Sequence, residues 1–328
     1  MTQPEHPPHR FEDLTELTEI GHGGTATVYR CTQPDGSMVA MKLFHAATAD
    51  DPAAVHFRRE AEARRRVPPH PALLAAQATG RAPDGRPYLL LELADQTLEQ
   101  HVAESGPMPW PDACALAVGV AGALETAHRA GLVHCDVSPA NVHLVGVTWK
   151  LGDFGAACDR SVADADRPVT LVHAPPEALR GAAAAPSRDV YGLAATLYHA
   201  IAGAPAFGDA TGQTAARIAG RIATEPVPDL RRTGTPDAVC RVVERAMSKD
   251  PARRPASVGQ LADELAEVAR SADVSVAPPL VLAPAAPHLT AAPPSVVGPP
   301  RRPVTVPPTH RRAGRGVAAL VGAAALAL

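Results

Sequence analysis

The chain has 328 residues, of which 46% are hydrophobic and 20% are charged. This much apolar sequence can bury a sizeable core, which excludes a disordered chain, a collagen and a small disulfide-stabilised scaffold. Only three of the 31 basic residues are lysines, namely Lys42, Lys150 and Lys249. Each lysine is therefore a candidate for a specific chemical role.

Charge divides the chain into two unlike parts. Residues 1–273 contain 26 basic and 34 acidic residues, a net charge of −8, and the remaining residues contain five arginines and no acid. An acidic body argues against a nucleic-acid-binding domain, which would present a basic face. We therefore expect no nucleic-acid partner, whereas the basic end is suited to an anionic surface.

The five cysteines are scattered and form neither a CxxC pair nor a metal-ligand spacing. Residues 1–10 lack the apolar run of a signal peptide and are interpreted as a short N-terminal extension. Together these features predict free thiols and a domain that works in the reducing cytoplasm.

The composition changes near residue 271. Eleven prolines lie between residues 271 and 310, and hydrophobic periodicity ends there. Because proline removes backbone donors and favours an extended chain, residues 271–313 are predicted to form a disordered linker.

The sequence ends in an apolar, Ala-rich tail at residues 314–328. Its twelve apolar residues from Val317 to Leu328 would make a helix about 18 Å long, at about 1.5 Å per residue. A bilayer core is about 30 Å thick. The tail is either a frayed end or the start of a membrane span cut short at Leu328. A span would tether the domain with Arg311, Arg312 and Arg315 on the cytoplasmic side.

Before residue 271, strand patterns come first and helical patterns later. The strand patterns are residues 14–22, 25–32, 37–44, 73–80 and 87–93, and the helical patterns are residues 51–67, 111–131, 189–203 and 258–271. We therefore expect an α+β domain at residues 11–270. A small antiparallel sheet with one main helix would occupy residues 11–93, and a larger, mostly helical lobe residues 94–270, with a cleft between them.

Three glycines, Gly21, Gly23 and Gly24, lie between the first two predicted strands. Without Cβ atoms, their backbone N–H groups can approach an anion closely. Taken alone, this stretch fits an ordinary Gly-rich hairpin better. Lys42, however, lies on the next strand, where it can hold phosphate oxygens if a carboxylate fixes its rotamer. Glu60 is the candidate for that carboxylate, although a solvated helix face explains Glu60 equally well in isolation.

The middle of the chain favours the phosphate-binding interpretation. The stretch HCDVSPANVHL places His134, Asp136 and Asn141 in one short loop, and Asp153 follows in WKLGDFGAA. Carboxylate and amide oxygens suit Mg²⁺, and a further carboxylate can accept the proton of an attacking hydroxyl. The pattern HxDxxxxN, followed by DFG twelve residues after Asn141, is seldom a coincidence.

These motifs and their order resemble those of protein kinases, in particular the bacterial, eukaryotic-like (Hanks-type) serine/threonine kinases. The resemblance implies a bilobal protein-kinase fold, ATP and Mg²⁺ as cofactors, and Ser/Thr hydroxyls of protein substrates as acceptors. It implies that Asp136 accepts the substrate proton and that Lys42, paired with Glu60, contacts the α- and β-phosphates. Asn141 and Asp153 would be the Mg²⁺ ligands.

The resemblance also implies a nucleotide pocket, with Leu91 as gatekeeper and the backbone of Glu92 and Ala94 against adenine. The implied cofactor-binding residues are Ile20, Gly21, His22, Gly23, Gly24, Val28, Ala40, Lys42, Glu60, Glu92, Ala94, Asn141 and Asp153, and the implied catalytic residues are Asp136, Lys42, Asn141 and Asp153.

Further roles follow from the same resemblance. Glu177 would pair with Arg254, and Asp189 would hold the catalytic loop. Thr170 stands where Ser/Thr-directed kinases carry a Thr that lines the acceptor site. The run that starts at Arg64 is interpreted separately, as a solvated helix end.

Three positions depart from the family pattern. Cys135 replaces the Arg that commonly precedes the catalytic Asp, which removes the cation that would pair with a phosphorylated activation loop. Ser138 stands where Ser/Thr kinases usually carry a Lys that stabilises the transferring phosphoryl group. Losing one such charge costs about 10²- to 10³-fold in rate. Ala26 for the third glycine of the loop is a milder change.

An active kinase is the leading hypothesis. The rival from another class is a pseudokinase, a nucleotide-binding scaffold that signals by conformation, and Ser138 motivates it. A small-molecule kinase of the aminoglycoside phosphotransferase kind shares the HxD loop, but the DFG motif, the PPE segment and the RRP pair disfavour it.

Overall fold

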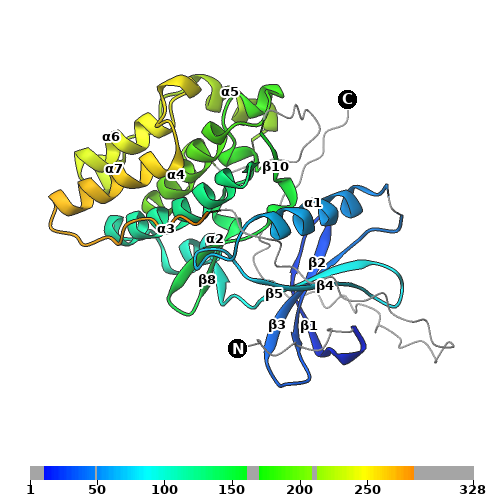
Figure 1. The fold of residues 1–328 in the computed structure, drawn as a ribbon. Coiled ribbons are helices and arrows are strands. Elements are labelled where there is room, and N and C mark those ends of the chain that lie inside the picture. Colours follow the sequence, from blue (N-terminus) through cyan, green and yellow to red (C-terminus); the bar gives the residue numbers. More distant parts are fainter. Residues whose placement is uncertain (1–10, 49, 161–169, 209–212, 284–328) are drawn as a thin grey trace.

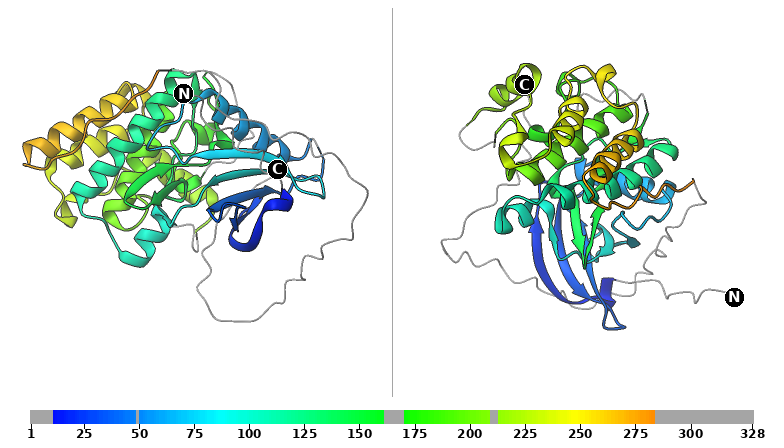
Figure 2. Two further views of the ribbon diagram at one scale, coloured as in Figure 1. Left: turned by 60° about the horizontal axis from the view of Figure 1, so that its bottom comes forward. Right: turned by 90° about the vertical axis from the view of Figure 1, so that its left-hand side faces the viewer.

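The computed structural model describes residues 11–48, 50–160, 170–208 and 213–283. These residues form two lobes, a β-sheet with one long helix and a larger, mostly helical part (Figure 1). Two further views show the same division, with the first strands (blue) at one end and the last helices (yellow to orange) at the other (Figure 2). The expected α+β, bilobal fold is confirmed.

The N-terminal lobe is built on an antiparallel sheet of five strands in the order β1-β2-β3-β5-β4. The strands are β1 (Thr15–His22), β2 (Ala26–Thr32), β3 (Met38–Phe44), β4 (Ala76–Arg81) and β5 (Pro87–Glu92). Side chains alternate along β3, so Val39 and Met41 pack in one apolar cluster while Ala40 and Phe44 pack in another. Lys42 belongs to the second of these faces.

Helix α1 (Pro52–Arg66) begins where the sequence predicts. The Asp51 side chain accepts a hydrogen bond from the N–H of Ala53, and Pro52 occupies the first turn. The ring of Phe57 packs edge-on against Phe44 of β3, with 5.3 Å between the ring centroids. α1 therefore docks on the sheet through the same face of β3 that carries Lys42.

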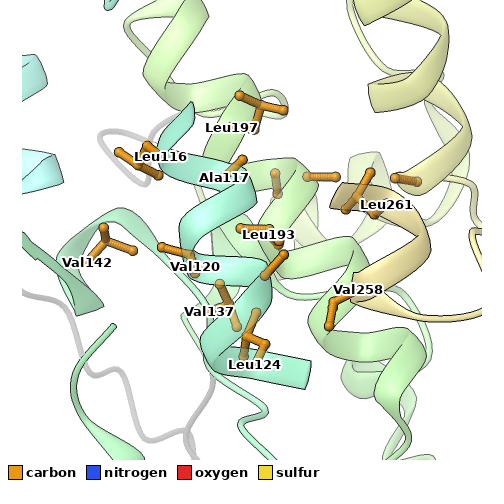
Figure 3. Close-up of a cluster of buried hydrophobic side chains, with 14 of the residues drawn as sticks. Leu116, Ala117, Val120, Leu124, Val137, Val142, Leu193, Leu197, Val258 and Leu261 are labelled. Atoms are coloured by element: carbon orange, nitrogen blue, oxygen red, sulfur yellow. The ribbon is translucent and has the colours of Figure 1, made fainter. Parts of the chain in front are cut away.

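Six helices make up most of the described part of the C-terminal lobe. They are α2 (Leu98–Ser105), α3 (Trp110–Arg129), α4 (Pro186–Ala202), α5 (Ala215–Thr224), α6 (Asp237–Ala246) and α7 (Val258–Ser271). Hydrophobic spacing predicts α3, α4 and α7, whose side chains, such as Val120, Leu193 and Leu261, form the core (Figure 3). The sequence patterns missed α2, α5 and α6, which have only 8, 10 and 10 residues.

Short strands position the loops between the lobes. β6 (Gln96–Thr97), β8 (Val142–Val145) and β9 (Thr148–Leu151) form one small sheet, and β7 (Leu132–Val133) pairs with β10 (Cys158–Asp159) in another. The chain between β7 and β8 carries Asp136 and Asn141, and the chain between β9 and β10 carries Asp153. The two short sheets thus hold the ends of both motif-bearing loops.

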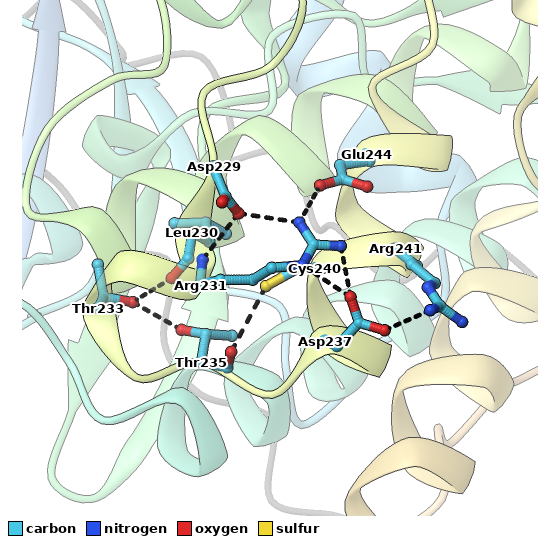
Figure 4. Close-up of polar contacts among 9 residues, drawn as sticks. All are labelled: Asp229, Leu230, Arg231, Thr233, Thr235, Asp237, Cys240, Arg241 and Glu244. Atoms are coloured by element: carbon cyan, nitrogen blue, oxygen red, sulfur yellow. Dashed lines mark hydrogen bonds and ion pairs between the residues drawn. The ribbon is translucent and has the colours of Figure 1, made fainter.

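An exposed ion-pair network links the start of α6 to the turn before it (Figure 4). The guanidinium of Arg231 lies 2.8 Å from Asp229, 2.7 Å from Asp237 and 2.6 Å from Glu244. Arg241 pairs with the second oxygen of Asp237 at 2.6 Å. The network orders a turn at the surface of the C-terminal lobe.

The chain after α7 does not leave the domain at residue 271. The carbonyl oxygen of Leu280 accepts a hydrogen bond from Nε2 of His70 at 2.8 Å, and the N–H of Leu282 donates to Oγ1 of Thr126 at 3.0 Å. This stretch runs back along α3 (Figure 1, orange). Residues 272–283 therefore differ from the expected disordered linker, because Thr126 of α3 and His70, which lies between α1 and β4, supply partners for their backbone.

The remaining expectations for the ends of the chain concern other residues. The extension at residues 1–10, the rest of the linker and the tail at residues 314–328 lie outside the described residues. Within the described part of the chain, no helix combines the length and the hydropathy that a membrane crossing requires.

Substitution of Gly122 in α3 tests the contact between this helix and the segment at residues 272–283. A Cβ atom at Gly122 would lie 2.3 Å from the carbonyl oxygen of Leu280, whereas one at Gly119 would meet nothing within 4 Å. Gly119→Ala should stabilise the domain by about 1 kcal/mol through helix propensity. Gly122→Ala should instead displace the segment and expose it to limited proteolysis. Equal protection of the segment in both variants would contradict the contact.

Candidate active site

Lys42 lies at the centre of the site. Its Nζ donates to Oε2 of Glu60 at 2.8 Å and lies 2.9 Å from Oδ2 of Asp153. β3 contributes the lysine, the middle of α1 contributes Glu60, and the loop after β9 contributes Asp153. The predicted pair of Lys42 and Glu60 is present, and Asp153 is a second partner of the same ammonium group.

The charges in this cluster stabilise one another. Burial disfavours the ammonium of Lys42, but the carboxylates of Asp153 and Glu60 outweigh that effect and raise its pKa above the ordinary value. Burial also disfavours the carboxylate of Asp153, yet Lys42 and then His56 hold the pKa of Asp153 well below its usual range. Lys42 and Asp153 are therefore both charged at neutral pH.

Arg64 belongs to this cluster, so the interpretation of its run as a solvated helix end is wrong for this residue. The Arg64 side chain is 6% exposed, and its guanidinium donates to the carbonyl oxygen of Leu74. It also lies 5.1 Å from the ring centroid of Phe154 and 3.6 Å from Oε1 of Glu60. The spacing of four residues from Glu60 places Arg64 on the same helix face, and that signal could have identified it.

His56 is a second site residue that the sequence interpretation missed. Its Nε2 lies 3.6 Å from Oδ1 of Asp153, an oxygen that also accepts a hydrogen bond from the N–H of Gly155 at 3.1 Å. A Cβ atom at Gly155 would lie 1.7 Å from Nε2 of His56. The glycine of the DFG motif therefore leaves the space that the imidazole occupies. His56 precedes Glu60 by four residues, the same spacing that identifies Arg64.

Both carboxylate oxygens of Asp136 have fixed partners. Oδ2 accepts a hydrogen bond from Nδ2 of Asn141 at 3.0 Å, and Oδ1 accepts one from the N–H of Thr170 at 3.0 Å. Burial raises the pKa of Asp136, although the hydrogen bonds from Thr170 oppose that rise. An oriented carboxylate with raised proton affinity is suited to accept a proton from a hydroxyl.

Asp189, at the start of α4, holds the loop that carries Asp136. Its carboxylate accepts hydrogen bonds from the N–H groups of His134 and Cys135, both at 2.8 Å, and contacts Nε2 of His128 at 2.7 Å. Cys135 has a φ of 68°, which is uncommon for a residue other than glycine. The two backbone hydrogen bonds stabilise this strained turn, and the predicted role of Asp189 is confirmed.

Asn141 and Asp153 present oxygen atoms that suit a divalent cation. The amide nitrogen of Asn141 is used by Asp136, where it also donates to the backbone carbonyl at 2.8 Å, so the amide oxygen is the atom that can bind a metal. The side chain of Asp153 is 34% exposed. Carboxylate and amide oxygens are the hard ligands that Mg²⁺ takes in proteins, so these residues fit the metal that the resemblance implies.

The apolar residues expected around adenine lie together. Ala40 pairs with Leu91 across β3 and β5, and both belong to one buried cluster. Val28 and Ala94 pack against the same cluster. Ile20 of β1, by contrast, is 47% exposed.

The glycine-rich turn joins β1 to β2. Gly21 and His22 are the last residues of β1, and the N–H of Gly23 donates to the carbonyl oxygen of Ala26 at 2.9 Å across the turn that also contains Gly24. Ala26 is 5% exposed and packs in the apolar cluster of the N-terminal lobe. The methyl group at the third-glycine position therefore contributes to packing.

Glu92, at the end of β5, makes a contact that the sequence did not predict. Both of its carboxylate oxygens accept hydrogen bonds from Nζ of Lys150 in β9, at 2.7 and 2.8 Å. This ion pair joins the large sheet of the N-terminal lobe to the small sheet of the C-terminal lobe. The expected contact of Glu92 with adenine would use its backbone, which this side-chain pairing leaves unchanged.

Ser138 replaces a lysine with a neutral, buried group. Ser138 is fully buried, and its Oγ has no hydrogen-bond partner among the described residues. The hydroxyl is therefore not presented to solvent in this arrangement, and it makes no contact that would substitute for a charge.

Glu177 and Arg254 form the predicted ion pair. Two guanidinium nitrogens of Arg254 contact the two oxygens of Glu177 at 2.6 and 2.8 Å, and the Arg254 side chain is fully buried. Arg254 also donates to the carbonyl oxygen of Ser187, in the first turn of α4. The pair thus joins the end of the activation segment, the chain from Asp153 to Glu177, to the helical core.

Replacing one partner of this pair should destabilise the domain strongly. Glu177→Gln leaves the buried guanidinium without its counter-charge and should lower the free energy of unfolding by about 3 kcal/mol, as measured by chemical denaturation. The matched control is Glu225→Gln, which removes the more exposed pair with Arg221 at 2.9 Å and should cost less than about 1 kcal/mol. Similar losses in the two variants would show that burial does not strengthen the Glu177 pair.

Comparison with known proteins agrees with this geometry. A family model described as protein kinase domain matches residues 14–266. Serine/threonine-protein kinase PknK of Mycobacterium tuberculosis is 38% identical over 269 residues, which cover 79% of this chain and 24% of that protein. Serine/threonine-protein kinase PknB of the same species is 33% identical over 285 residues, which cover 82% of this chain and 44% of that protein.

The matched region therefore corresponds to less than half the length of these two relatives. It includes the lysine of β3, the loop between β7 and β8, and the DFG motif, and these are the segments that the structure brings together. The chain belongs to the protein kinase family, with bacterial serine/threonine kinases among its relatives.

Proposed function

We propose that the chain transfers a phosphoryl group from ATP to Ser/Thr hydroxyls of protein substrates in bacterial signalling. One observation carries this proposal: Lys42 is paired with Glu60 and Asp153 at once, at 2.8 and 2.9 Å. A phosphate-binding lysine and a metal-binding carboxylate are thereby held at one point. Phosphoryl transfer depends mainly on positioning and on electrostatic stabilisation, which such an arrangement supplies.

Each residue of the site would have a distinct role in phosphoryl transfer. ATP with Mg²⁺ supplies the phosphoryl group and a cation that neutralises its charge. Lys42 would bind phosphate oxygens, with its rotamer fixed by Glu60, while Asp153 and the amide oxygen of Asn141 would hold the metal. Asp136 would accept the proton of the substrate hydroxyl on a carboxylate oxygen.

Thr170 supports Ser/Thr hydroxyls as the acceptors. Its N–H donates to Oδ1 of Asp136 at 3.0 Å, so the residue that would line the acceptor site lies directly beside the proposed base. The names of the relatives, which are serine/threonine-protein kinases, point to the same class of acceptor.

The cytoplasm is the proposed compartment of the kinase domain. All five cysteines are thiols buried in the described residues, as expected in a reducing environment. A membrane tether through residues 314–328 is the alternative that the apolar tail and its preceding arginines suggest.

A nucleotide-binding pseudokinase is the second candidate. The observation that favours it is Ser138, because this fully buried serine supplies no charge where family members usually place a lysine. Lys42, Glu60, Asp136, Asn141 and Asp153 are all present, however, and this complete set favours turnover.

Replacing Asp136 separates the two candidates. Asp136→Asn keeps the size of the side chain but removes the proton acceptor, so turnover of ATP with a generic Ser/Thr substrate should fall by about 10²- to 10⁴-fold. The matched control is Asp263→Asn, the same change at an exposed position of α7, which should leave the rate unchanged. Equal background rates for the wild-type chain and Asp136→Asn would favour the scaffold.

Substitutions of Ser138 test how much the missing lysine charge affects the rate. Ser138→Lys restores a cation near the transferred group and should raise kcat by at least about tenfold, since one such charge is worth about 10²- to 10³-fold. Ser138→Ala removes a hydroxyl that has no hydrogen-bond partner among the described residues, and steady-state kinetics should show little change. A large loss in Ser138→Ala would mean that the hydroxyl itself contributes to the reaction.

A further inference from the structure

Two cysteines from separate segments meet beside the proposed catalytic base. The Sγ atoms of Cys135 and Cys158 are 3.3 Å apart, and both residues are thiols. Cys135 directly precedes Asp136, and Cys158 is the first residue of β10, five residues after Asp153. The contact therefore connects the catalytic loop with the beginning of the activation segment.

We propose that Cys135 and Cys158 are a site of reversible disulfide formation, which locks the start of the activation segment against the catalytic loop. The disulfide itself depends only on the two thiols and their surroundings. Its regulatory meaning rests on the proposed function, because the locked segment is the one that carries Asp153.

The backbone already brings the two residues into the necessary position. β7 and β10 pair antiparallel with Cys158 opposite Val133, two residues before Cys135. The sulfur atoms need to approach from 3.3 Å to the bond length of about 2.05 Å. Small rotations of the two side chains can supply this movement while the strand pairing is kept.

The surroundings of the sulfur atoms are apolar and small. Cys135 and Cys158 pack with Val133, Ala156 and Ala184 in one buried cluster. This packing restricts other positions of the two side chains, so each sulfur has the other as its nearest reaction partner. The contact with Cys158 and then burial raise the pKa of the Cys135 thiol, so the thiol is protonated at neutral pH and reacts slowly with an oxidant.

Hydrogen peroxide is the oxidant that balances the reaction. The Cys135 sulfur attacks one peroxide oxygen, which gives a sulfenic acid and releases one water. The Cys158 sulfur then attacks the sulfenic sulfur, forms the S–S bond and releases a second water. Two thiols lose two electrons and two protons, and a dithiol reductant reverses the change. Although its reaction is slow, Cys135 is the thiol that the oxidant can reach first, because it lines a small cavity together with Thr170 and His173.

The disulfide would form at Cys135, a position where family members commonly carry a positively charged arginine. An arginine at the position of Cys135 would hold a phosphorylated activation loop through an ion pair, and this chain has no such arginine. The S–S bond provides a covalent link between the same two segments. Because the two sulfur atoms approach each other while Lys42 is paired with Glu60 and Asp153, the link retains the arrangement that the proposed function requires.

Cys240 provides a matched control. It is buried on α6, and its Sγ donates to the carbonyl oxygen of Thr235 at 3.6 Å. Its environment is thus also buried, but its contact is with a backbone oxygen. Cys240→Ala removes one buried thiol and leaves the proposed pair intact.

The test is a disulfide map of the full chain after treatment with hydrogen peroxide. Remaining thiols are alkylated, the protein is digested without reductant, and mass spectrometry identifies linked peptides. We expect a peptide that joins Cys135 to Cys158 in the wild type and in Cys240→Ala, and none in Cys158→Ala. Hydrogen exchange of the backbone amides at residues 156–160 should slow severalfold in the oxidised protein and recover with dithiothreitol.

Two results would overturn the proposal. One is that both thiols can still be alkylated after the peroxide-treated protein is denatured, and the other is that Cys135 is oxidised to a sulfinic acid without any link. Neither measurement uses ATP turnover. If the chain forms the disulfide but transfers phosphate neither with it nor without it, the proposed function alone is overturned. If the chain is an active kinase whose two thiols do not become linked, the disulfide proposal alone is overturned.

Discussion

The rest of the site depends on one buried group of charges. Lys42 would be unstable in the interior as an isolated cation, and Glu60, which is fully buried, would be unstable as an isolated anion. Each is stable because the other lies 2.8 Å away. The contact requires α1 to dock on the sheet and requires the chain after β9 to return, because Asp153 and Arg64 complete the balance of charges. The two lobes are thus joined through the same atoms that would bind ATP.

The geometry of an α-helix explains how α1 serves this cluster. His56, Glu60 and Arg64 are spaced by four residues and lie on one face, so a single docked helix contacts Asp153, Lys42 and the ring of Phe154. A Cβ atom at Gly155 would occupy the place of the His56 imidazole, so the glycine allows His56 to contact Asp153. The position of α1 therefore helps to fix the position of the loop that carries Asp153 and would hold the metal.

The loop that carries Asp136 is held by hydrogen bonds rather than by cations. Family members commonly have positively charged residues at the positions of Cys135 and Ser138, and both residues here are neutral and buried. Asp189 holds the backbone of the loop through two N–H groups, and Asn141 orients the carboxylate of Asp136. The position of the proposed base is therefore kept without the two charges, and the change at residue 135 places a thiol 3.3 Å from that of Cys158.

The sequence alone determined the order of strands and helices, the family resemblance and the residues Lys42, Asp136, Asn141 and Asp153, because hydrophobic periodicity and motif spacing are local properties. It also predicted two long-range pairs, of Lys42 with Glu60 and of Glu177 with Arg254, through the resemblance. Only the tertiary structure decided that Lys150 pairs with Glu92, that residues 272–283 lie along α3 and that the Cys135 and Cys158 thiols meet. Each of these contacts joins segments whose separation along the chain carries no information about their distance in space, and that distance is set by how the helices and strands pack.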